Sequence, residues 1–294
     1  MRIFPKKQIE GRLALVAVGC FLFSLPFLVM GKAQFMVLLT WGIGLIYFFA
    51  FYLPHYLRRR EITKSPLSDE DVEILNKWVS FYDELSPEDK ELYEADIQVF
   101  LDEHHIVGVD DVTVTREVEL LVAASAIRLI FRRPQWEYRD FGDILIYPGS
   151  FSTDGTYSTN IRNGERAAAG MVHSIGSVIL SLPHLYRSFE HKHDGFNVGY
   201  HEFAHVLDGF RPNGIPDELS MGATGRWCEI MRKEFEKVHK GKSVLRQYAG
   251  TNEAEFFAVA VEVFFEKPEL LEKKAPEVYE QLVEFFRQDP ESSK

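Results

Sequence analysis

Two long uncharged stretches stand out near the start of the chain. Residues 13–30 (LALVAVGCFLFSLPFLVM) carry no charge over 18 positions, and residues 35–53 (FMVLLTWGIGLIYFFAFYL) carry none over 19. A helix needs roughly 20 mostly apolar residues to cross the core of a bilayer, so both stretches qualify as membrane spans. The connector GKAQ between them has room only for a tight turn. We therefore expect residues 1–60 to form a transmembrane hairpin, followed by a polar linker at 61–71.

Beyond the linker, apolar residues first recur at helical spacing, then alternate at strand spacing, and then return to helical spacing. Ser68 and Ser86 precede acidic turns as helix caps, and Pro87 suits a first helical position. The predicted helices cover residues 72–85, 87–103, 115–131, 197–208, 224–238, 252–266 and 276–288, and the predicted strands cover 143–149 and 174–182. We expect an α+β fold in which residues 72–294 form one mainly helical domain with a small sheet.

Basic residues predict how the hairpin is oriented. Only Lys32 lies between the two spans, whereas four basic residues precede the first span and four follow the second: Arg2, Lys6, Lys7, Arg12, Arg58, Arg59, Arg60 and Lys64. Because basic flanks stay on the cytoplasmic side, both termini and the domain should be cytoplasmic, in a multi-pass protein of the cytoplasmic (inner) membrane. A cleaved signal peptide is the alternative for the first span, but it has no small-residue cleavage site.

Charge and cysteine content narrow the class of protein. The 230 residues after Lys64 carry 24 Lys and Arg against 42 Asp and Glu, a formal charge of −18. Such an acidic domain argues against nucleic acid as a partner. Two cysteines, Cys20 and Cys228, cannot build a disulfide framework and fit a reducing compartment.

The stretch NVGYHEFAHVLDG, residues 197–209, holds a His-Glu-x-x-His pattern. On a helix, His201 and His205 share one face and can hold two corners of a zinc site. Glu202, next to the first histidine, can then take a proton from a water molecule at the metal. Asn197 and Gly209 suit the two ends of such a helix. The alternative is a chance pair of histidines on a buried helix.

A third zinc ligand must come from elsewhere, because the longer pattern HExxHxxGxxH is not completed here. Glu255 and Glu262 interrupt an otherwise apolar helix, and a buried carboxylate needs a partner such as a metal or an imidazole. Glu255 also suits a capping box with Asn252, in which its side chain reaches back to the Asn252 amide. Spacing alone leaves both interpretations of Glu255 open.

The sequences HEFAHVLDG, YAGTNEAEFFAVAVEVFFEKPELL, FGDILIYPGSF and VILSLPHL closely resemble the Mlc titration factor A family of zinc peptidases. Their catalytic domain is similar to that of anthrax lethal factor. The resemblance implies His201, His205 and Glu255 as zinc ligands, Glu202 as general base, and Tyr248, seven residues before Glu255, as a hydrogen-bond donor to the transition state. Glu262 and Asp208 are then expected to accept hydrogen bonds from the outer ring N–H groups of the ligand histidines.

The sequence therefore predicts a membrane-anchored zinc metallopeptidase that acts on a peptide or protein substrate, and the resemblance implies aminopeptidase-like activity. Lethal-factor-like endopeptidase activity is an alternative, and so is a membrane-tethered zinc protein that binds a partner without turnover. Better-known, soluble members of the family have been linked to binding a glucose-responsive repressor. The expected hairpin, which would contact lipid through residues 13–53, argues against that partner here. We expect the strand at 177–182 to be an edge strand that pairs with an extended peptide. The sequence EHKHD at 190–194 looks metal-like but suits an exposed turn.

Overall fold

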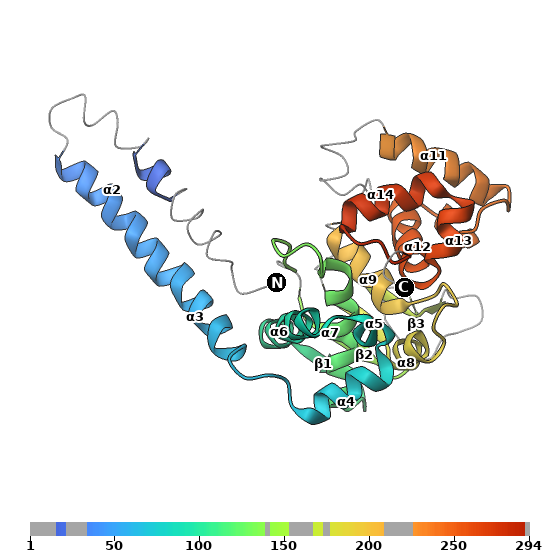
Figure 1. Cartoon of the computed structure of the whole chain (residues 1–294), viewed down its shortest axis with the longest axis horizontal. Helices are drawn as coiled ribbons and strands as arrows, with labels where there is room; N and C mark the ends of the chain where they lie inside the picture. Colours follow the sequence, from blue (N-terminus) through green and yellow to red (C-terminus); the bar gives the residue numbers. More distant parts are fainter. Residues whose placement is uncertain are drawn as a thin grey trace. The chain divides into compact units, whose positions relative to one another are not determined.

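The structure is a computed structural model of the chain that describes residues 16–21, 34–138, 142–152, 167–172, 177–208 and 226–291. The chain forms two compact units, Met1–Pro66 and Leu67–Lys294 (Figure 1). Every residue for which the sequence predicts chemistry lies in the second unit.

The first unit contains a long apolar helix. α2 (Gln34–Tyr47) continues through a π-helical stretch, η1 (Phe48–Tyr52), into α3 (Leu53–Ile62). Within it, Leu38–Ile62 is long and apolar enough to cross a membrane, judged by length and composition. The second predicted span thus lies on a helix that also takes up the start of the predicted linker. Of the first span only residues 16–21 are described, as helix, so the hairpin stays a prediction.

Polar caps set the helix starts in the second unit. The Ser68 side chain accepts a hydrogen bond from the Asp71 amide at the start of α4 (Asp69–Trp78), and Ser86 does the same for Asp89 at α6 (Pro87–Glu103). Thr115 caps α7 (Arg116–Ile130). The starts at Ser68 and Ser86 confirm the caps predicted from the sequence, because each hydroxyl satisfies an amide that the helix itself leaves unpaired.

The prediction of one helix over residues 72–85 is wrong. Val79 leaves the helical region, with φ −102° and ψ 90°, and a separate short helix, α5 (Ser80–Glu84), follows it. Val79 is 3% exposed, so the break places this side chain in the core. No glycine or proline marks the position in the sequence.

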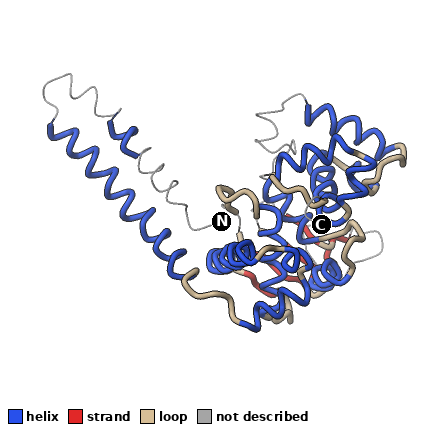
Figure 2. Tube along the Cα trace, viewed as in Figure 1, coloured by secondary structure: helices blue, strands red, loops and turns tan. Residues whose placement is uncertain are grey.

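A four-stranded mixed sheet lies among the helices of the second unit (red in Figure 2). β1 (Ile106–Gly108), β2 (Ile144–Tyr147) and β6 (Val178–Ser181) are parallel, and β5 (Gly170–Val172) runs antiparallel to β6. The order is β1-β2-β6-β5, and a separate two-stranded ladder joins β3 (Phe151–Ser152) to β4 (Ala167–Ala168).

The expectation that residues 177–182 form an edge strand is wrong, because β6 is hydrogen-bonded on both sides, to β2 and to β5. All four residues of β6 are buried, as suits an interior strand. β5 ends the described part of the sheet on this side.

α7 is the central helix of the second unit, with Val118 and every residue from Leu120 to Ile130 buried. It packs against α4, α6 and α9 (Val198–Leu207). Gly199 permits the close approach of α9, because a Cβ there would lie 2.5 Å from Cβ of Ser125. This contact sets where α9 packs along α7. α9 is the helix that carries the His-Glu-x-x-His pattern.

The remaining helices complete the unit around α9. α8 (Leu182–Glu190) follows β6 directly, and α11 (Arg226–His239) leads to a short 3₁₀ turn, η2 (Gln247–Gly250). α12 (Glu253–Glu266) packs against both α9 and η2, and it is buried from Phe256 to Glu266. α13 (Pro268–Lys274) and α14 (Pro276–Phe286) are the last two helices of the described residues. The fold is α+β and mostly helical with a small mixed sheet, as the sequence predicted.

Candidate metal centre

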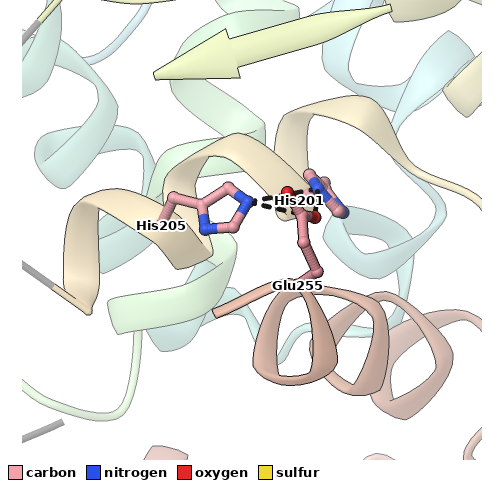
Figure 3. A group of neighbouring side chains, drawn as sticks. All are labelled: His201, His205 and Glu255. Carbon is pink, nitrogen blue, oxygen red and sulfur yellow. Dashed lines mark hydrogen bonds and ion pairs between the residues drawn. The ribbon is translucent and has the colours of Figure 1, made fainter. Parts of the chain in front are cut away.

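α9 carries two histidines whose side chains point to one place. The Asn197 side chain caps this helix by accepting a hydrogen bond from the Tyr200 amide, 3.0 Å away. One helical turn separates His201 from His205, so both imidazoles leave the same face. Their Nε2 atoms lie 3.2 Å apart (Figure 3).

α12 brings Glu255 to the two histidines from 54 residues further along the chain (Figure 3). Oε2 of Glu255 lies 3.0 Å from Nε2 of His201 and 3.5 Å from Nε2 of His205. Asn252 does cap α12 by accepting from the Glu255 amide at 2.9 Å, but the Glu255 carboxylate is turned to the histidines. The structure thus combines one half of the expected capping box with the placement that a metal ligand needs.

The protonation pattern around His201 makes this set of atoms suitable for a cation. Glu262, which is fully buried, places Oε1 2.7 Å from Nδ1 of His201. Burial raises the pKa of Glu262, but the charge of His201 and the hydrogen bonds from His201 and Arg246 outweigh it and lower the pKa below its usual value. The ionised Glu262 therefore accepts a hydrogen bond from the Nδ1–H group, and Nε2 of a neutral His201 presents a lone pair toward Glu255.

Without a cation, that lone pair would face the Glu255 carboxylate and the second imidazole, so a proton must take the cation's place. Burial lowers the pKa of His201, but Glu262 and Glu255 outweigh it and raise the pKa to about 10. Burial also raises the pKa of Glu255, yet the hydrogen bonds from His201 and His205 bring it below its usual value. Two imidazole nitrogens and one carboxylate oxygen, all within 4.8 Å of one another, fit a divalent metal ion.

Glu202 lies beside this group and is nearly inaccessible, at 2% exposed. Its Oε2 atom has no hydrogen-bond partner among the described residues. Burial raises the pKa of Glu202 to about 7, with the neighbouring histidines acting in the opposite direction. A carboxyl group with a free oxygen and a pKa near neutrality is suited to taking up and releasing a proton.

Tyr248 reaches the group from the η2 turn. Its hydroxyl donates a hydrogen bond to Oε1 of Glu255 at 3.1 Å, and its ring centroid lies 6.0 Å from that of His201. Burial and the nearby Glu255 carboxylate raise the pKa of Tyr248 above its usual value, which keeps the hydroxyl protonated as a donor. The residue as a whole is half exposed.

Two residues at the site have no signal in the sequence. Arg246 donates two hydrogen bonds to Glu262, and Gly170 on β5 lies against Glu202. Asp208, by contrast, was predicted to contact a ligand histidine. It is the C-cap of α9 and is 2% exposed, and its contact with an imidazole stays a prediction.

The second candidate sequence, residues 190–194, is exposed as expected: Glu190 ends α8, and residues 191–194 form a turn. The His193 amide donates to Oε2 of Glu266 at 2.7 Å, and its Nδ1 lies 3.0 Å from the Glu266 carbonyl oxygen. These contacts tie the turn to the end of α12. Within the described ranges, the three ligand candidates of Figure 3 are the one cluster that could hold a metal ion.

Comparison with known proteins gives consistent matches. A family model described as glucose-regulated metallo-peptidase M90 matches residues 54–287. An uncharacterized protein of Synechocystis sp. is 32% identical over 269 residues, which cover 86% of this chain and 97% of the relative. Mlc titration factor A of Yersinia enterocolitica is 32% identical over 163 residues, which cover 51% of this chain and 60% of that protein.

Among solved structures, the Pro-Pro endopeptidase from Paenibacillus alvei matches with a TM-score of 0.38 at 15% identity, over 64% of this chain and 100% of that one. This likeness is too slight to carry an argument. The family match and the sequence relatives confirm the resemblance drawn from the motifs.

Proposed function

The chain belongs to the M90 family of glucose-regulated metallopeptidases, and we propose that it is a membrane-anchored zinc peptidase. The observation that carries the proposal is the convergence of His201, His205 and Glu255 beside the partly unpartnered carboxyl group of Glu202. Three ligand atoms with a proton carrier next to them form the minimum site for metal-assisted hydrolysis.

In this proposal, Nε2 of His201, Nε2 of His205 and a carboxylate oxygen of Glu255 hold the zinc ion. Bound there, zinc supplies Lewis acidity to a water molecule and to the carbonyl group of a peptide. The chain itself orients the ligands. Glu262 holds the His201 ring by its Nδ1 proton, and the α9 backbone sets the spacing between the two imidazoles.

Glu202 is the proposed general base. Its unpartnered Oε2 is free to accept a proton from the attacking water and to deliver it to the leaving amine. The raised pKa of Glu202, about 7 because of burial, suits both steps near neutral pH. The neighbouring strand β5 keeps the carboxyl group from turning away, since Gly170 lies in contact with it.

Tyr248 is the proposed donor to the carbonyl oxygen as that atom gains negative charge. Its hydroxyl already lies 3.1 Å from Glu255, and half of its surface is exposed, so a small rotation would bring it to a bound carbonyl group. Donors of this kind stabilise the developing charge more than they stabilise the substrate.

The peptide is proposed to lie along β5 rather than β6. β5 ends the described part of the sheet and passes the Glu202 carboxyl group at Gly170. A strand at the edge of a sheet offers unpaired main-chain groups to an extended peptide. A peptide paired with β5 would have its scissile bond near Glu202. The aminopeptidase mode of cleavage is proposed on the family resemblance alone.

Anchoring in the cytoplasmic membrane is proposed from the composition of the first unit. The helix Leu38–Ile62 meets the length and apolarity of one span, and the uncharged residues 13–30 provide the second. A domain held beneath the bilayer would act on substrates near the membrane. The peptide or protein that it cleaves is the proposed partner.

The test of this function is the Glu202→Gln variant of the full chain. It should bind zinc like the wild type and lose hydrolysis of a peptide library, with kcat lowered by about 10²-fold or more. Glu91→Gln, an exposed change on α6, should leave both properties intact. Wild-type protein that binds zinc and peptides without cleaving any would contradict the proposal, and the cleavage sites in the library would show whether the enzyme removes N-terminal residues.

A further inference from the structure

Arg246 reaches from the η2 turn to a buried carboxylate behind the metal centre. Its Nη1 donates to Oε2 of Glu262 at 2.9 Å, and its Nη2 donates to Oε1 at 2.5 Å. The two parallel hydrogen bonds form a bidentate fork, which fixes the carboxylate plane as well as neutralising its charge. The Arg246 side chain is 32% exposed, whereas that of Glu262 is fully buried.

Glu262 links three elements of the second unit. Besides Arg246 from η2, it accepts hydrogen bonds from two groups near the start of α9. The Asn197 amide lies 2.8 Å from Oε2, and Nδ1 of His201 lies 2.7 Å from Oε1. A carboxylate with no exposure to water depends on such donors, because a buried charge that loses its partner is strongly destabilised.

The position of Arg246 in the chain adds a second link. The Ala249 amide donates to the Arg246 carbonyl oxygen at 2.9 Å, which closes the turn that carries Tyr248. The guanidinium also lies over the Phe196 ring, 5.1 Å from its centroid. The side chain and the backbone of this one residue thus join the expected metal ligand to the expected hydrogen-bond donor.

We propose that Arg246 is a positioning residue for metal binding, which acts through Glu262 to hold the His201 ring with Nδ1 protonated and Nε2 directed at the metal. The inference rests on the proposed function and adds a residue that no motif in the sequence marks. The same pair of hydrogen bonds fixes the position of the η2 turn, so that Tyr248 stays at a constant distance from the metal ligands. Lysine cannot reproduce the fork, because its ammonium is a point charge without two parallel donors.

Zinc affinity of the full chain, measured by competition with a chromophoric chelator, tests this directly. Arg246→Gln should raise the zinc dissociation constant about 10-fold, the lower end of the range for removing a direct hydrogen-bond partner of a metal ligand, because Arg246 acts through Glu262. Arg246→Lys should give a smaller rise, because it keeps the charge and loses the fork. Arg132→Gln is the matched control, since it removes a similar fork to Asp89 on the surface of the same unit and should leave zinc affinity unchanged.

A double-mutant cycle identifies the route of the effect. Glu262→Gln should weaken zinc binding by itself, and adding Arg246→Gln should weaken it by less than about 3-fold more, because Arg246 acts through Glu262. At saturating zinc, Arg246→Gln should lower kcat with little change in KM, because the Tyr248 turn loses its fixed place.

Wild-type affinity in folded Arg246→Gln, or fully additive effects in the cycle, would overturn the inference while leaving the proposed function intact. Wild-type protein that binds no zinc would overturn both. Should Arg246→Gln fail to fold, Arg246→Lys decides the question, and wild-type zinc affinity in that variant would overturn the need for the fork.

Discussion

Gly170 lies directly against the carboxyl group of Glu202. A Cβ atom at this position would be 2.7 Å from Cγ and 2.8 Å from Cδ of the glutamate, far closer than carbon atoms approach without strain. Glu202 is 2% exposed, so it has little space to move away. The short strand β5 therefore sets the position of the proposed base.

Gly170→Ala should lower kcat/KM about 100-fold, because a displacement of about 1 Å at a reacting group has an effect of this size. Zinc content should stay at the wild-type level, since the three atoms nearest to such a Cβ all belong to Glu202 and not to a proposed ligand. Gly149→Ala is the control, because a Cβ at Gly149 meets no atom within 4 Å. Full activity in Gly170→Ala would show that the carboxyl group adapts freely and that β5 does not position it.

Tyr248→Phe should reduce kcat about 10²–10³-fold, the range for removing one donor to a developing oxyanion. KM and zinc content should change little, because the hydroxyl contacts Glu255 through a single hydrogen bond at the edge of the site. Steady-state kinetics on a peptide substrate measure this. Tyr186→Phe, which removes a hydroxyl bonded to Glu117 on α7, serves as the control. An unchanged kcat in Tyr248→Phe would remove the residue from the mechanism.

The buried carboxyl group of Glu266 should make stability depend on pH. Burial raises the pKa of Glu266 to about 7, only partly opposed by hydrogen bonds from Asn197 and His193. The folded chain therefore holds this proton more tightly than the unfolded chain does. Its stabilising effect is complete below the usual glutamate pKa and is lost as the pH rises through about 7, a change on the order of 3 kcal/mol.

Glu266→Gln cannot titrate, so its free energy of unfolding should fall less between pH 5 and pH 8 than that of the wild type. Urea unfolding at the two pH values, followed by tryptophan fluorescence, gives the comparison. Glu190→Gln, an exposed acid on α8, should keep the wild-type difference. An identical pH difference in Glu266→Gln and the wild type would contradict the assignment.

The orientation in the membrane is open to a direct test. Basic residues flank the two uncharged stretches on their outer sides, so a reporter fused after Lys294 should be exposed to the cytosol. A fluorescent protein that matures only in the cytosol should be bright, and alkaline phosphatase at the same position should be inactive. Active phosphatase would reverse the proposed topology.

Elements with strong local signals could be predicted from the sequence alone. α6 has the predicted bounds because Ser86 satisfies a free amide and Pro87 suits the first helical position. α9 and α12 likewise start after Asn197 and Asn252. Each of these side chains accepts a hydrogen bond from the amide three residues further along the chain. In each case the information lies within one helical turn.

Features that depend on distant contacts could not be predicted. β1 and β5 have three residues each, too few to show a period, and the interior place of β6 depends on which strands pair with it. The break at Val79 has no glycine or proline beside it, and the buried side chain at this position meets partners that lie elsewhere in the chain. α8 was missed although Pro183 lies in its first turn, so a local signal existed there.

The residues of the site also fall into those with a local sequence signal and those that depend on distant contacts. The shared role of His201 and His205 could be predicted from their spacing, because both lie on one helix. For Glu255, only the family resemblance favoured the role of ligand over that of helix cap. Arg246 and Gly170 meet their partners only through tertiary packing, and nothing in their own neighbourhoods marks them.

The central claim is that three side chains from α9 and α12 hold a zinc ion. Metal analysis of the purified full chain tests it most directly, with His205→Ala and Glu255→Ala as variants that each remove one ligand. The account predicts about one zinc ion per wild-type chain and little or none in either variant, because a catalytic zinc site needs its three protein ligands. A metal-free wild type that cannot be loaded with zinc, or full zinc content in both variants, would contradict it.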